Sequence, residues 1–409
     1  MNQKFLNQIR QLQQNKLVIL RERRTAAARE IIKQLTQGYN YVDLSLPLAC
    51  LQARRNPQGF VQGLQLPVYL DNLQYVPQLL PAIAKNSVPT DKVLASCTQS
   101  FALVKEAEKL NNVRFVDLPV GSMGDELAHA SASEAEKLAA TAEATSLMQA
   151  EALPPFSLEQ NYLEHLGQRE PVDVISTLWQ GERQAYGGSY DAYLQRVMQS
   201  DIMYLTTVSS SEKFYSFMIA AATMAGKLVN YVKLAQAAGI TPPTAKTWLS
   251  FLRGTGIVYL LQPVKNIGLK RIVSTPKLYF RDTGLACDLL GLDAKSVQQS
   301  EYLPQLEQNY MLNKIRESYI NEGLAPRLRF YHDNNKKNID VIVRKADVLY
   351  PLMLAHSKLE AERVQFAFEV LAEYAKAHGF TLGNGGIIYP ACVTQELLPD
   401  LWQLSAQRL

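Results

Sequence analysis

The fold is most readable in one continuous stretch, LVNYVKLAQAAGI (228–240), TPPTAKTWLSFLRG (241–254) and IVYLL (257–261). Apolar residues recur at helical spacing in the first two segments, a glycine closes the first, and Thr-Pro-Pro begins the second. The third segment has the β-branched and aromatic residues of a strand, and the basic turn KNIGLKR follows at 265–271. The order helix, turn, helix, strand and basic hairpin predicts a winged helix, which we place at 207–292.

Two interpretations of this winged helix stay open. It would bind duplex DNA if the polar side chains of its second helix entered the major groove and the cations of the hairpin contacted phosphates. The candidate DNA-binding residues are Thr244, Lys246, Thr247, Ser250 and Arg253 on the helix, and Lys265, Lys270 and Arg271 on the hairpin. Alternatively, the winged helix is a packing module between domains. In either case we expect Trp248 to lie in the core.

Composition bounds the class of protein. The chain has 409 residues, enough for two or three domains, and its 47% hydrophobic and 20% charged residues are typical of globular proteins. A net charge of +4 does not identify a nucleic-acid-binding protein, so any basic surface must be local. The four cysteines have no CxxC spacing, which argues against a disulfide framework or a zinc site. Because we find neither a signal sequence nor a run of about 18 apolar residues, we expect a cytoplasmic protein without a membrane partner.

The first 120 residues alternate short apolar runs with helical segments. The runs lie at 17–20, 41–44, 67–71, 92–96 and 114–118, and a helix is expected at 26–35. Buried strands separated by helices predict βαβ units, and hence an α/β domain with a parallel sheet. From 124 to 155 the composition shifts to Ala, Glu, Ser, Thr and Met, which indicates an insertion.

Three phrases carry a resemblance to a known group of proteins. They are NPQGF at 56–60, PVYLDNLQ at 67–74 and TPKLYFRDTGLA at 275–286. With them the chain resembles bacterial and archaeal AAA-type ATP-binding proteins that have an N-terminal P-loop domain, a winged helix and a C-terminal nuclease-like domain. The resemblance implies a P-loop-like AAA domain at 1–123, the insertion at 124–155, a helical lid at 156–206, the winged helix at 207–292 and a nuclease-like α/β domain at 293–409.

The nucleotide site that this resemblance implies has lost most of its chemistry. A phosphate-binding loop needs glycines, a lysine and a Ser or Thr hydroxyl, but residues 20–28 read LRERRTAAA. In place of an Asp-Glu pair the chain has Asp71-Asn72, and asparagine cannot accept a proton from water. Arg114 matches an arginine that contacts the γ-phosphate in the group. We therefore predict a degenerate nucleotide site without a cofactor, formed by Arg21, Arg23, Arg24, Asp71, Asn72 and Arg114. An alternative is an anion held by the three N-terminal arginines alone.

The C-terminal part resembles a nuclease-like fold. We expect helices at 301–322 and 359–378, strands at 327–332, 338–343 and 348–354, and a closing strand at 386–390. The resemblance implies a metal site made of a helix glutamate, a strand aspartate and a Glu-x-Lys motif. Asp340 matches, Gln308 takes the glutamate position with Glu307 beside it, and Met-Leu-Ala at 353–355 replaces Glu-x-Lys. Too few carboxylates remain to hold magnesium, so we predict a degenerate nuclease site at Glu307, Gln308 and Asp340 with no metal. His332 and His356 are candidate substitute ligands.

The losses at both sites predict a pseudoenzyme rather than an ATPase or nuclease. Our first hypothesis is a scaffold or assembly protein that binds itself or a protein partner. The second is a DNA-binding regulator that acts through the winged helix. The third is a residual ATP-binding protein, for which Asp71 is the surviving residue.

Overall fold

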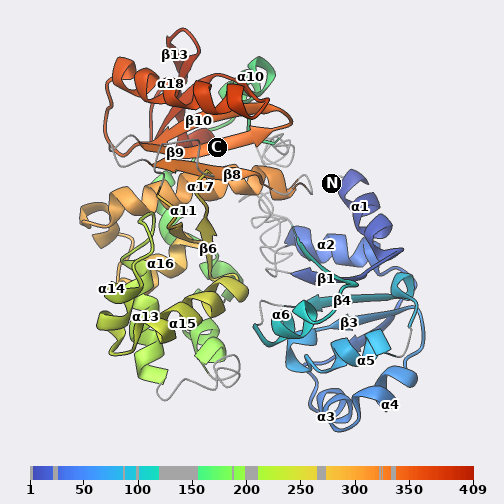
Figure 1. Ribbon diagram of the computed structural model, residues 1–409. Helices are drawn as coiled ribbons and strands as arrows, with labels where there is room; N and C mark the ends of the chain where they lie inside the picture. Colours follow the sequence, from blue (N-terminus) through green and yellow to red (C-terminus); the bar gives the residue numbers. More distant parts are fainter. Residues whose placement is uncertain are drawn as a thin grey trace, which may run out of the picture. The chain divides into compact units, whose positions relative to one another are not determined.

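The computed structural model (Figure 1) describes residues 3–21, 26–85, 88–97, 101–118, 155–186, 188–198, 211–264, 273–321, 324, 326–332 and 338–409. The chain divides into two compact units, the first made of Met1–Glu151, Arg196–Thr206 and Ile320–Leu324, the second of Ala152–Gln195, Thr207–Tyr319 and Ala325–Leu409. Some predictions fall outside the described residues. These are the insertion at 124–155 except its last residue, Arg23 and Arg24, and the basic turn with Lys265, Lys270 and Arg271.

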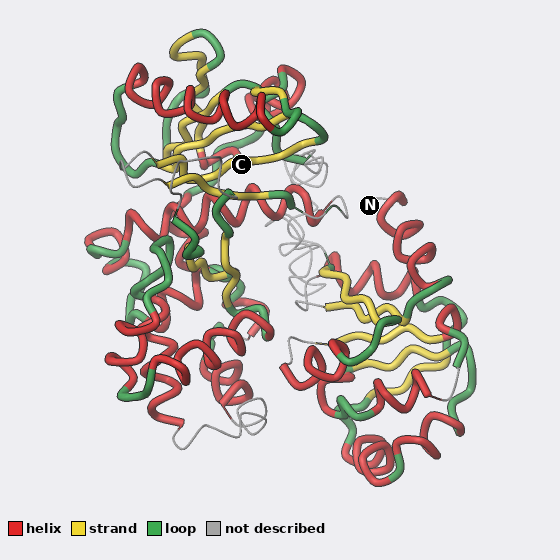
Figure 2. Tube along the Cα trace, in the orientation of Figure 1, coloured by secondary structure: helices red, strands yellow, loops and turns green. Residues whose placement is uncertain are grey.

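The first unit is an α/β domain with a parallel sheet, as predicted. Its elements are α1 (Gln3–Gln13), β1 (Leu17–Arg21), α2 (Ala26–Leu35), β2 (Asn40–Asp43), α3 (Pro47–Arg55), α4 (Pro57–Gln62), β3 (Val68–Asp71), the 3₁₀ helix η1 (Leu73–Tyr75), α5 (Leu79–Lys85), η2 (Thr90–Lys92), β4 (Val93–Cys97), α6 (Phe101–Glu108) and β5 (Val113–Asp117). The strands lie in the order β2-β3-β4-β1-β5, and each neighbouring pair is parallel. Figure 2 shows these strands as one layer with helices around it.

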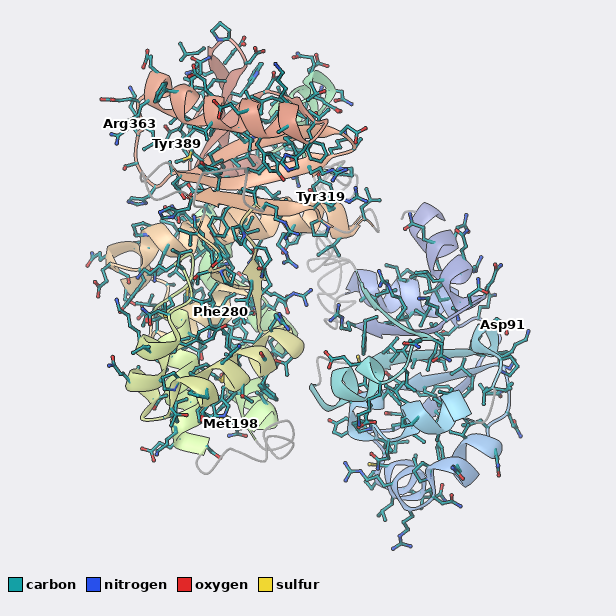
Figure 3. The ribbon with its side chains drawn as sticks, viewed as in Figure 1. Asp91, Met198, Phe280, Tyr319, Arg363 and Tyr389 are labelled. Carbon is teal, nitrogen blue, oxygen red and sulfur yellow. The ribbon has the colours of Figure 1, made fainter. Side chains whose placement is uncertain are left out.

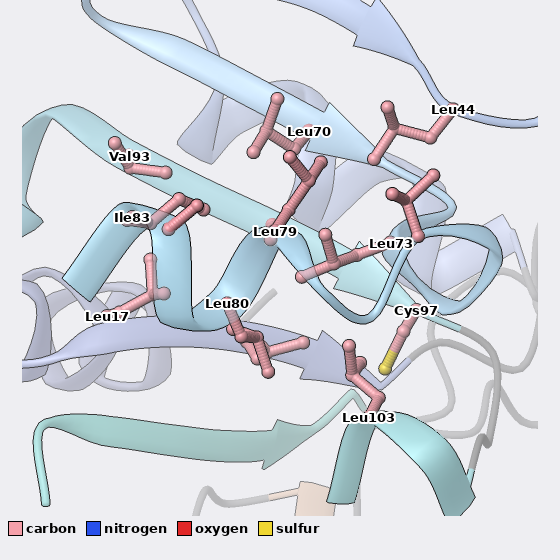
Figure 4. Packing of buried hydrophobic residues seen from close by; sticks show 14 of the residues in the cluster. Leu17, Leu44, Leu70, Leu73, Leu79, Leu80, Ile83, Val93, Cys97 and Leu103 are labelled. Carbon is pink, nitrogen blue, oxygen red and sulfur yellow. The ribbon is translucent and has the colours of Figure 1, made fainter. Parts of the chain in front are cut away.

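Strand β1 shows why the sheet is covered on both faces. All four of its leading residues are apolar and buried, and successive side chains in a strand point to opposite faces. Leu17 and Ile19 pack in a cluster with residues of α5 and α6, and Figure 4 shows Leu79 and Leu80 of α5 there. Val18 and Leu20 pack instead with α1 and α2. A short, fully apolar run therefore becomes an inner strand, between β4 and β5, of a three-layer domain.

The elements after residue 155 belong to the second unit, except the last residues of α12 and α17. They are α10 (Gln160–Gln168), α11 (Val174–Gln180), η3 (Arg183–Tyr186), α12 (Asp191–Arg196), α13 (Ser211–Ala222), α14 (Tyr231–Ala238), α15 (Pro242–Gly254), β6 (Val258–Leu261), β7 (Lys277–Phe280), α16 (Thr283–Leu289), η6 (Ser296–Gln299), α17 (Leu303–Asn321), β8 (Leu328–His332), β9 (Asn338–Lys345), β10 (Val348–Leu354), α18 (Ala361–Ala377), β11 (Thr381–Leu382), β12 (Gly385–Tyr389), β13 (Gln395–Leu398), β14 (Leu401–Ser405) and η7 (Ala406–Arg408).

Helices α13 to α15 and the antiparallel pair β6–β7 follow the predicted winged-helix order. The side chains of Asn230 and Thr241 cap α14 and α15, and Gly239 ends α14 at φ +61, a left-handed conformation that glycine adopts without strain. Helix α14 begins three residues later than expected. The reason is that Leu228 is extended and forms an isolated β-bridge with Lys277.

The C-terminal sheet has seven strands, in the order β13-β14-β12-β10-β9-β8 with β11 paired to β10. Helix α18 covers one face, where Phe368 and Leu371 join the core. The prediction that 386–390 closes the sheet is wrong, because β12 lies between β10 and β14. Strand β13 was missed because its sequence QELL has exposed polar residues at its start and no apolar run.

The winged helix and the C-terminal sheet share a hydrogen-bonded seam. The backbone N–H of Val264 donates to the carbonyl of Phe330 over 2.8 Å, and the N–H of Phe330 donates to the carbonyl of Gln262 over 3.2 Å. Farther along, the N–H of Val273 donates to the carbonyl of His332 over 3.0 Å. The described residues on either side of the basic turn are therefore both attached to β8.

The segment assigned to a helical lid, 156–206, lies in the second unit as far as Gln195. The N–H of Phe156 donates to the Ser318 hydroxyl over 2.9 Å, and the hydroxyl of Tyr319, labelled in Figure 3, donates to the carbonyl of Phe156 over 2.5 Å. Arg169 donates to the carbonyl of Leu409 over 2.8 Å. These contacts bind the start of the segment to α17 and to the residues after β14.

Candidate functional site

The surviving aspartate of the nucleotide site, Asp71, is surrounded by donors of its own chain. Its Oδ2 accepts the hydroxyl of Tyr41 over 2.8 Å. Its Oδ1 accepts the hydroxyl of Ser96, the backbone N–H of Asn72 over 2.8 Å and, at 3.5 Å, the hydroxyl of Tyr69. Both carboxylate oxygens are thus hydrogen-bonded to neutral groups at the carboxyl edge of the parallel sheet.

Asn72 shapes the turn that follows. Its backbone lies in the left-handed region, at φ 60 and ψ 40, which asparagine adopts more readily than most residues with a Cβ. Its side-chain amide donates to Asp43 Oδ1 over 3.0 Å and accepts from Gln74 over 3.0 Å. The residue that replaces the expected glutamate therefore has a structural role here.

The arginines predicted for this site do not all lie together. Arg21 is the last residue of β1, and its guanidinium lies over the ring of Phe115, 5.3 Å from the centroid. Arg114 pairs with Val18 in the sheet register, so it lies three residues back towards the amino end of the strands. At about 3.3 Å per residue this separates the two positions by roughly 10 Å along the sheet. The structure thus sets Arg114 apart from the edge that holds Asp71.

The surviving aspartate of the nuclease-like site, Asp340, is in a buried ion pair. Its Oδ1 lies 3.0 Å from Lys277 Nζ and accepts the Asn338 amide over 2.7 Å, and its Oδ2 accepts the backbone N–H of Leu354 over 3.1 Å. Asp340 and Lys277 are each only 7% exposed. The Lys277 ammonium also lies 5.2 Å from the ring centroid of Phe330. Lys277 comes from β7 of the winged helix, so the pair joins the two parts of this unit.

The other two residues of the degenerate nuclease site fasten α17 to the end of β10. Glu307, 3% exposed, lies with its Oε2 2.6 Å from Nδ1 of the half-exposed His356. Burial raises the pKa of Glu307, while the hydrogen bond and charge of His356 oppose that shift. Gln308 donates to the carbonyl of Leu354 over 2.8 Å. Gln308 and Asp340 thus contact Leu354 at the end of β10, and Glu307 contacts His356 two residues farther on.

Sequence reasoning did not find Lys277. The signal was a single lysine at the head of the apolar strand KLYF, all four residues of which are buried. A lysine in such a place indicates a buried partner, but the partner is 63 residues away and no spacing rule names it. His356 was considered as a metal ligand, whereas the structure shows it paired with Glu307.

Helix α15 presents a polar face and buries an apolar one. Lys246, Thr247, Ser250 and Arg253 are exposed and Thr244 is half-buried. On the opposite face Trp248 is 1% exposed and packs edge-on against two phenylalanines of α13, its ring centroid 5.2 Å from that of Phe214 and 5.5 Å from that of Phe217. The expected core position of Trp248 is confirmed.

The phrase RDTGLA, from 281 to 286, makes a close junction between α11 and α16. Asp282 accepts the Tyr190 hydroxyl over 2.5 Å and the backbone N–H groups of Gly284 over 2.9 Å and Glu182 over 3.3 Å. A Cβ on Gly284 would lie 2.9 Å from the Cα of Gly181, too close for any side chain. The aspartate and the glycine of this phrase thus hold two helices together.

Among the described residues, no three His, Cys, Asp or Glu side chains are arranged so that they could hold a metal ion. The described helices also include none with the length and apolar character needed to cross a membrane.

Comparisons with known proteins cover parts of the chain. The model of a domain of unknown function, DUF8612, matches residues 175–296, which run from α11 to the start of η6. Uncharacterized proteins of Mycobacterium bovis and Mycobacterium tuberculosis are each 30% identical over 139 residues, which is 34% of this chain and 30% of each relative. A structure of the replication initiator DnaA bound to AMPPCP and single-stranded DNA aligns with 61% of this chain and 86% of its own, at 10% identity and a TM-score of 0.19. That score is too low to support a structural argument.

Proposed function

We propose that the protein is a catalytically silent relative of the AAA-type ATP-binding proteins and acts as a scaffold or assembly protein. One observation carries the proposal. In each of the two candidate sites the remaining aspartate is bound by donors of its own chain, Asp71 by the hydroxyls of Tyr41 and Ser96, and Asp340 by the ammonium of Lys277. The acidic residues that would hold magnesium serve as internal hydrogen-bond acceptors.

The hydrogen bonds at the candidate nucleotide site support the proposal that this site is catalytically silent. Magnesium bound to a nucleotide is held by a carboxylate or hydroxyl of the protein together with phosphate oxygens and water. The hydroxyls of Tyr41 and Ser96 already occupy lone pairs of both Asp71 oxygens, so a metal would compete with them, and the sequence supplies no P-loop lysine or hydroxyl to help hold it. Asn72 cannot act as a base towards water.

The charges at the nuclease-like site support the proposal that this site, too, is catalytically silent. A divalent cation beside Asp340 would lie next to the ammonium of Lys277, and like charges repel strongly where little water screens them. Lys277 would have to leave a position that is 7% exposed, which would leave its charge without a partner. The ammonium thus already neutralises the carboxylate.

Titration calorimetry with ATP and magnesium tests the first site, and incubation of linear duplex DNA with magnesium or manganese tests the second. We expect no saturable heat and no cleavage. Saturable binding that Asp71→Ala abolishes, or cleavage that Asp340→Asn abolishes, would refute the silent-site proposal. The binding role is tested separately by light scattering of the full chain across concentrations and by capture of a protein partner.

A second candidate function, duplex DNA binding, is favoured by the exposed polar face of α15. The test is a gel-shift titration at low salt, where phosphate contacts are strongest. Lys246→Glu should weaken binding and lower the salt dependence by about one counterion. Lys233→Glu on α14 is the matched control, since Lys233 is also an exposed lysine of the winged helix. Equal losses in both variants would indicate a non-specific charge effect and remove this candidate.

A further inference from the structure

Exposed leucine side chains lie on helix α3 and directly before it. Leu46, directly before the helix, is 56% exposed, Leu48 is 71% exposed and Leu51 is 50% exposed, whereas Ala53 is the buried residue of the helix. Leu48, Leu51 and Arg55 follow the spacing i, i+3, i+7 and so share one helical face. Single exposed leucines are ordinary, but two on one helical face, with a third directly before the helix, are of the kind that marks interaction surfaces, and we call these three leucines the α3 patch.

The patch is positive at the C-terminal end of α3. Arg54 and Arg55 end α3, whose sequence PLACLQARR contains no acidic residue. Arg54 donates from Nε and Nη2 to the carbonyl of Tyr75, over 3.1 and 2.8 Å. Within the described part of the chain, neither arginine forms an ion pair with a carboxylate.

Helix α18 has an outer face of the complementary kind. Its inner face packs into the core of the C-terminal sheet. On the outer face Glu362, Phe366 and Glu369 are exposed at the spacing i, i+4, i+7, and Phe366 is 58% exposed. Arg363, labelled in Figure 3, lies beside them, so the three charged residues around Phe366 carry a net charge of −1, from two carboxylates and one guanidinium. This face combines an exposed aromatic ring with an acidic rim.

We propose that copies of this chain associate head to tail, with α3 of one copy docked on α18 of the next. Leu48 and Leu51 would cover the ring of Phe366, and the arginines that end α3 would meet Glu362 and Glu369. A symmetric contact of α3 with α3 would bring four arginines together, and one of α18 with α18 would bring carboxylates together, so charge favours the unlike pair. The inference rests on the proposed scaffold function and specifies its surfaces.

The two faces of this contact differ, so each copy offers one α3 face and one α18 face to other copies. A stable interface typically buries about 800 Å² on each partner, more than three leucines and one ring supply. We therefore expect an association that depends on concentration and weakens as salt screens the charged rim.

The test uses sedimentation velocity of the full chain across concentrations, with Leu48→Glu and Phe366→Glu as variants. Each variant removes one face and keeps the other, so each alone should lose association by at least about tenfold, equivalent to about 1.4 kcal/mol. An equimolar mixture should recover a dimer, because the α18 face of the Leu48→Glu protein can bind the α3 face of the Phe366→Glu protein. Val232→Glu, at a 53% exposed position on α14, is the control and should behave like wild type.

Three outcomes would overturn the inference. If the wild type associates and both variants do so equally, the surfaces are wrong although the scaffold function stands. If the variants lose association and the mixture does not recover it, the contact is not head to tail. If the wild type remains a monomer at all concentrations, the inference fails, and the scaffold function then depends on the partner-capture experiment. Thermal melts by circular dichroism check that each variant is folded.

Discussion

Replacing Lys277 by methionine should destabilise the second unit strongly. Methionine keeps most of the apolar stem beside Phe330 but removes the ammonium that lies 3.0 Å from Asp340. The carboxylate of Asp340, a residue only 7% exposed in the wild type, would then keep two neutral donors, the amide of Asn338 and the N–H of Leu354. Removing one member of a buried pair costs about 3–5 kcal/mol, and since two neutral donors persist we expect about 3 kcal/mol.

The pair can be separated from simple loss of packing by a double-mutant cycle. Asp340→Asn alone should also destabilise, because Lys277 then lacks its carboxylate. The double variant Lys277→Met/Asp340→Asn leaves no unpaired charge in the interior. Its loss of unfolding free energy should therefore be smaller than the sum of the two single losses by about 2 kcal/mol.

Urea denaturation followed by tryptophan fluorescence measures these differences in the relevant unit. Trp179, Trp248 and Trp402 are the three tryptophans of the chain, and all lie in the second unit. The fluorescence transition therefore reports that unit without interference from the first. A loss below about 1 kcal/mol for Lys277→Met, or strictly additive losses in the cycle, would refute the assignment of Lys277 and Asp340 as a coupled buried pair.

Three further predictions concern the same unit. Gly181→Ala should lower the free energy of unfolding by about 3 kcal/mol, because the new Cβ would lie 2.0 Å from Asp282 Oδ1 and the backbone is at φ +49. Gly291→Ala is the control. Its backbone is at φ +68 but nothing lies within 4 Å of the new Cβ, so the same urea titration should show a loss of about 1 kcal/mol. Burial raises the pKa of Glu307 above its usual 4.5, so the contribution of this carboxyl to stability is greatest below pH 4.5 and falls as pH rises through the folded-state pKa. Glu307→Gln should lessen that fall in urea titrations made at a series of pH values. The same pH dependence in the variant as in the wild type would contradict this prediction. Trp248→Ala should cost about 3–5 kcal/mol, read by circular dichroism, and a loss near zero would show that the aromatic cluster is not a core.

The sequence predicted the elements whose pattern is local. The apolar run of β1, the capped helix α15 and the glycine that ends α14 all follow from residues within one or two turns of each other. Strand β13 was missed because half of it is exposed and its pattern is weak. The displaced start of α14 depends on a bridge from Leu228 to a residue 49 positions later, which no local rule contains.

At the candidate sites, too, the sequence predicted the local features but not the contacts between distant residues. The absence of a P-loop lysine and of Glu-x-Lys could be read directly from the chain. What the remaining aspartates contact could not, because Tyr41 and Ser96 reach Asp71 from two other strands, and Lys277 reaches Asp340 from another part of the unit. Motifs identify which chemistry is missing, whereas three-dimensional contacts show what has taken its place.

The backbone hydrogen bonds that join Gln262 and Val264 to β8 determine where this chain can be divided into stable fragments. A winged helix cut out at 207–292 would lose the backbone partners of Gln262, Val264 and Val273, and would leave Lys277 facing water without Asp340. Recombination that exchanged only the C-terminal sheet would leave the same groups exposed. The winged helix and the C-terminal sheet are thus expected to fold as one unit, and expression of either half alone should yield an aggregation-prone fragment.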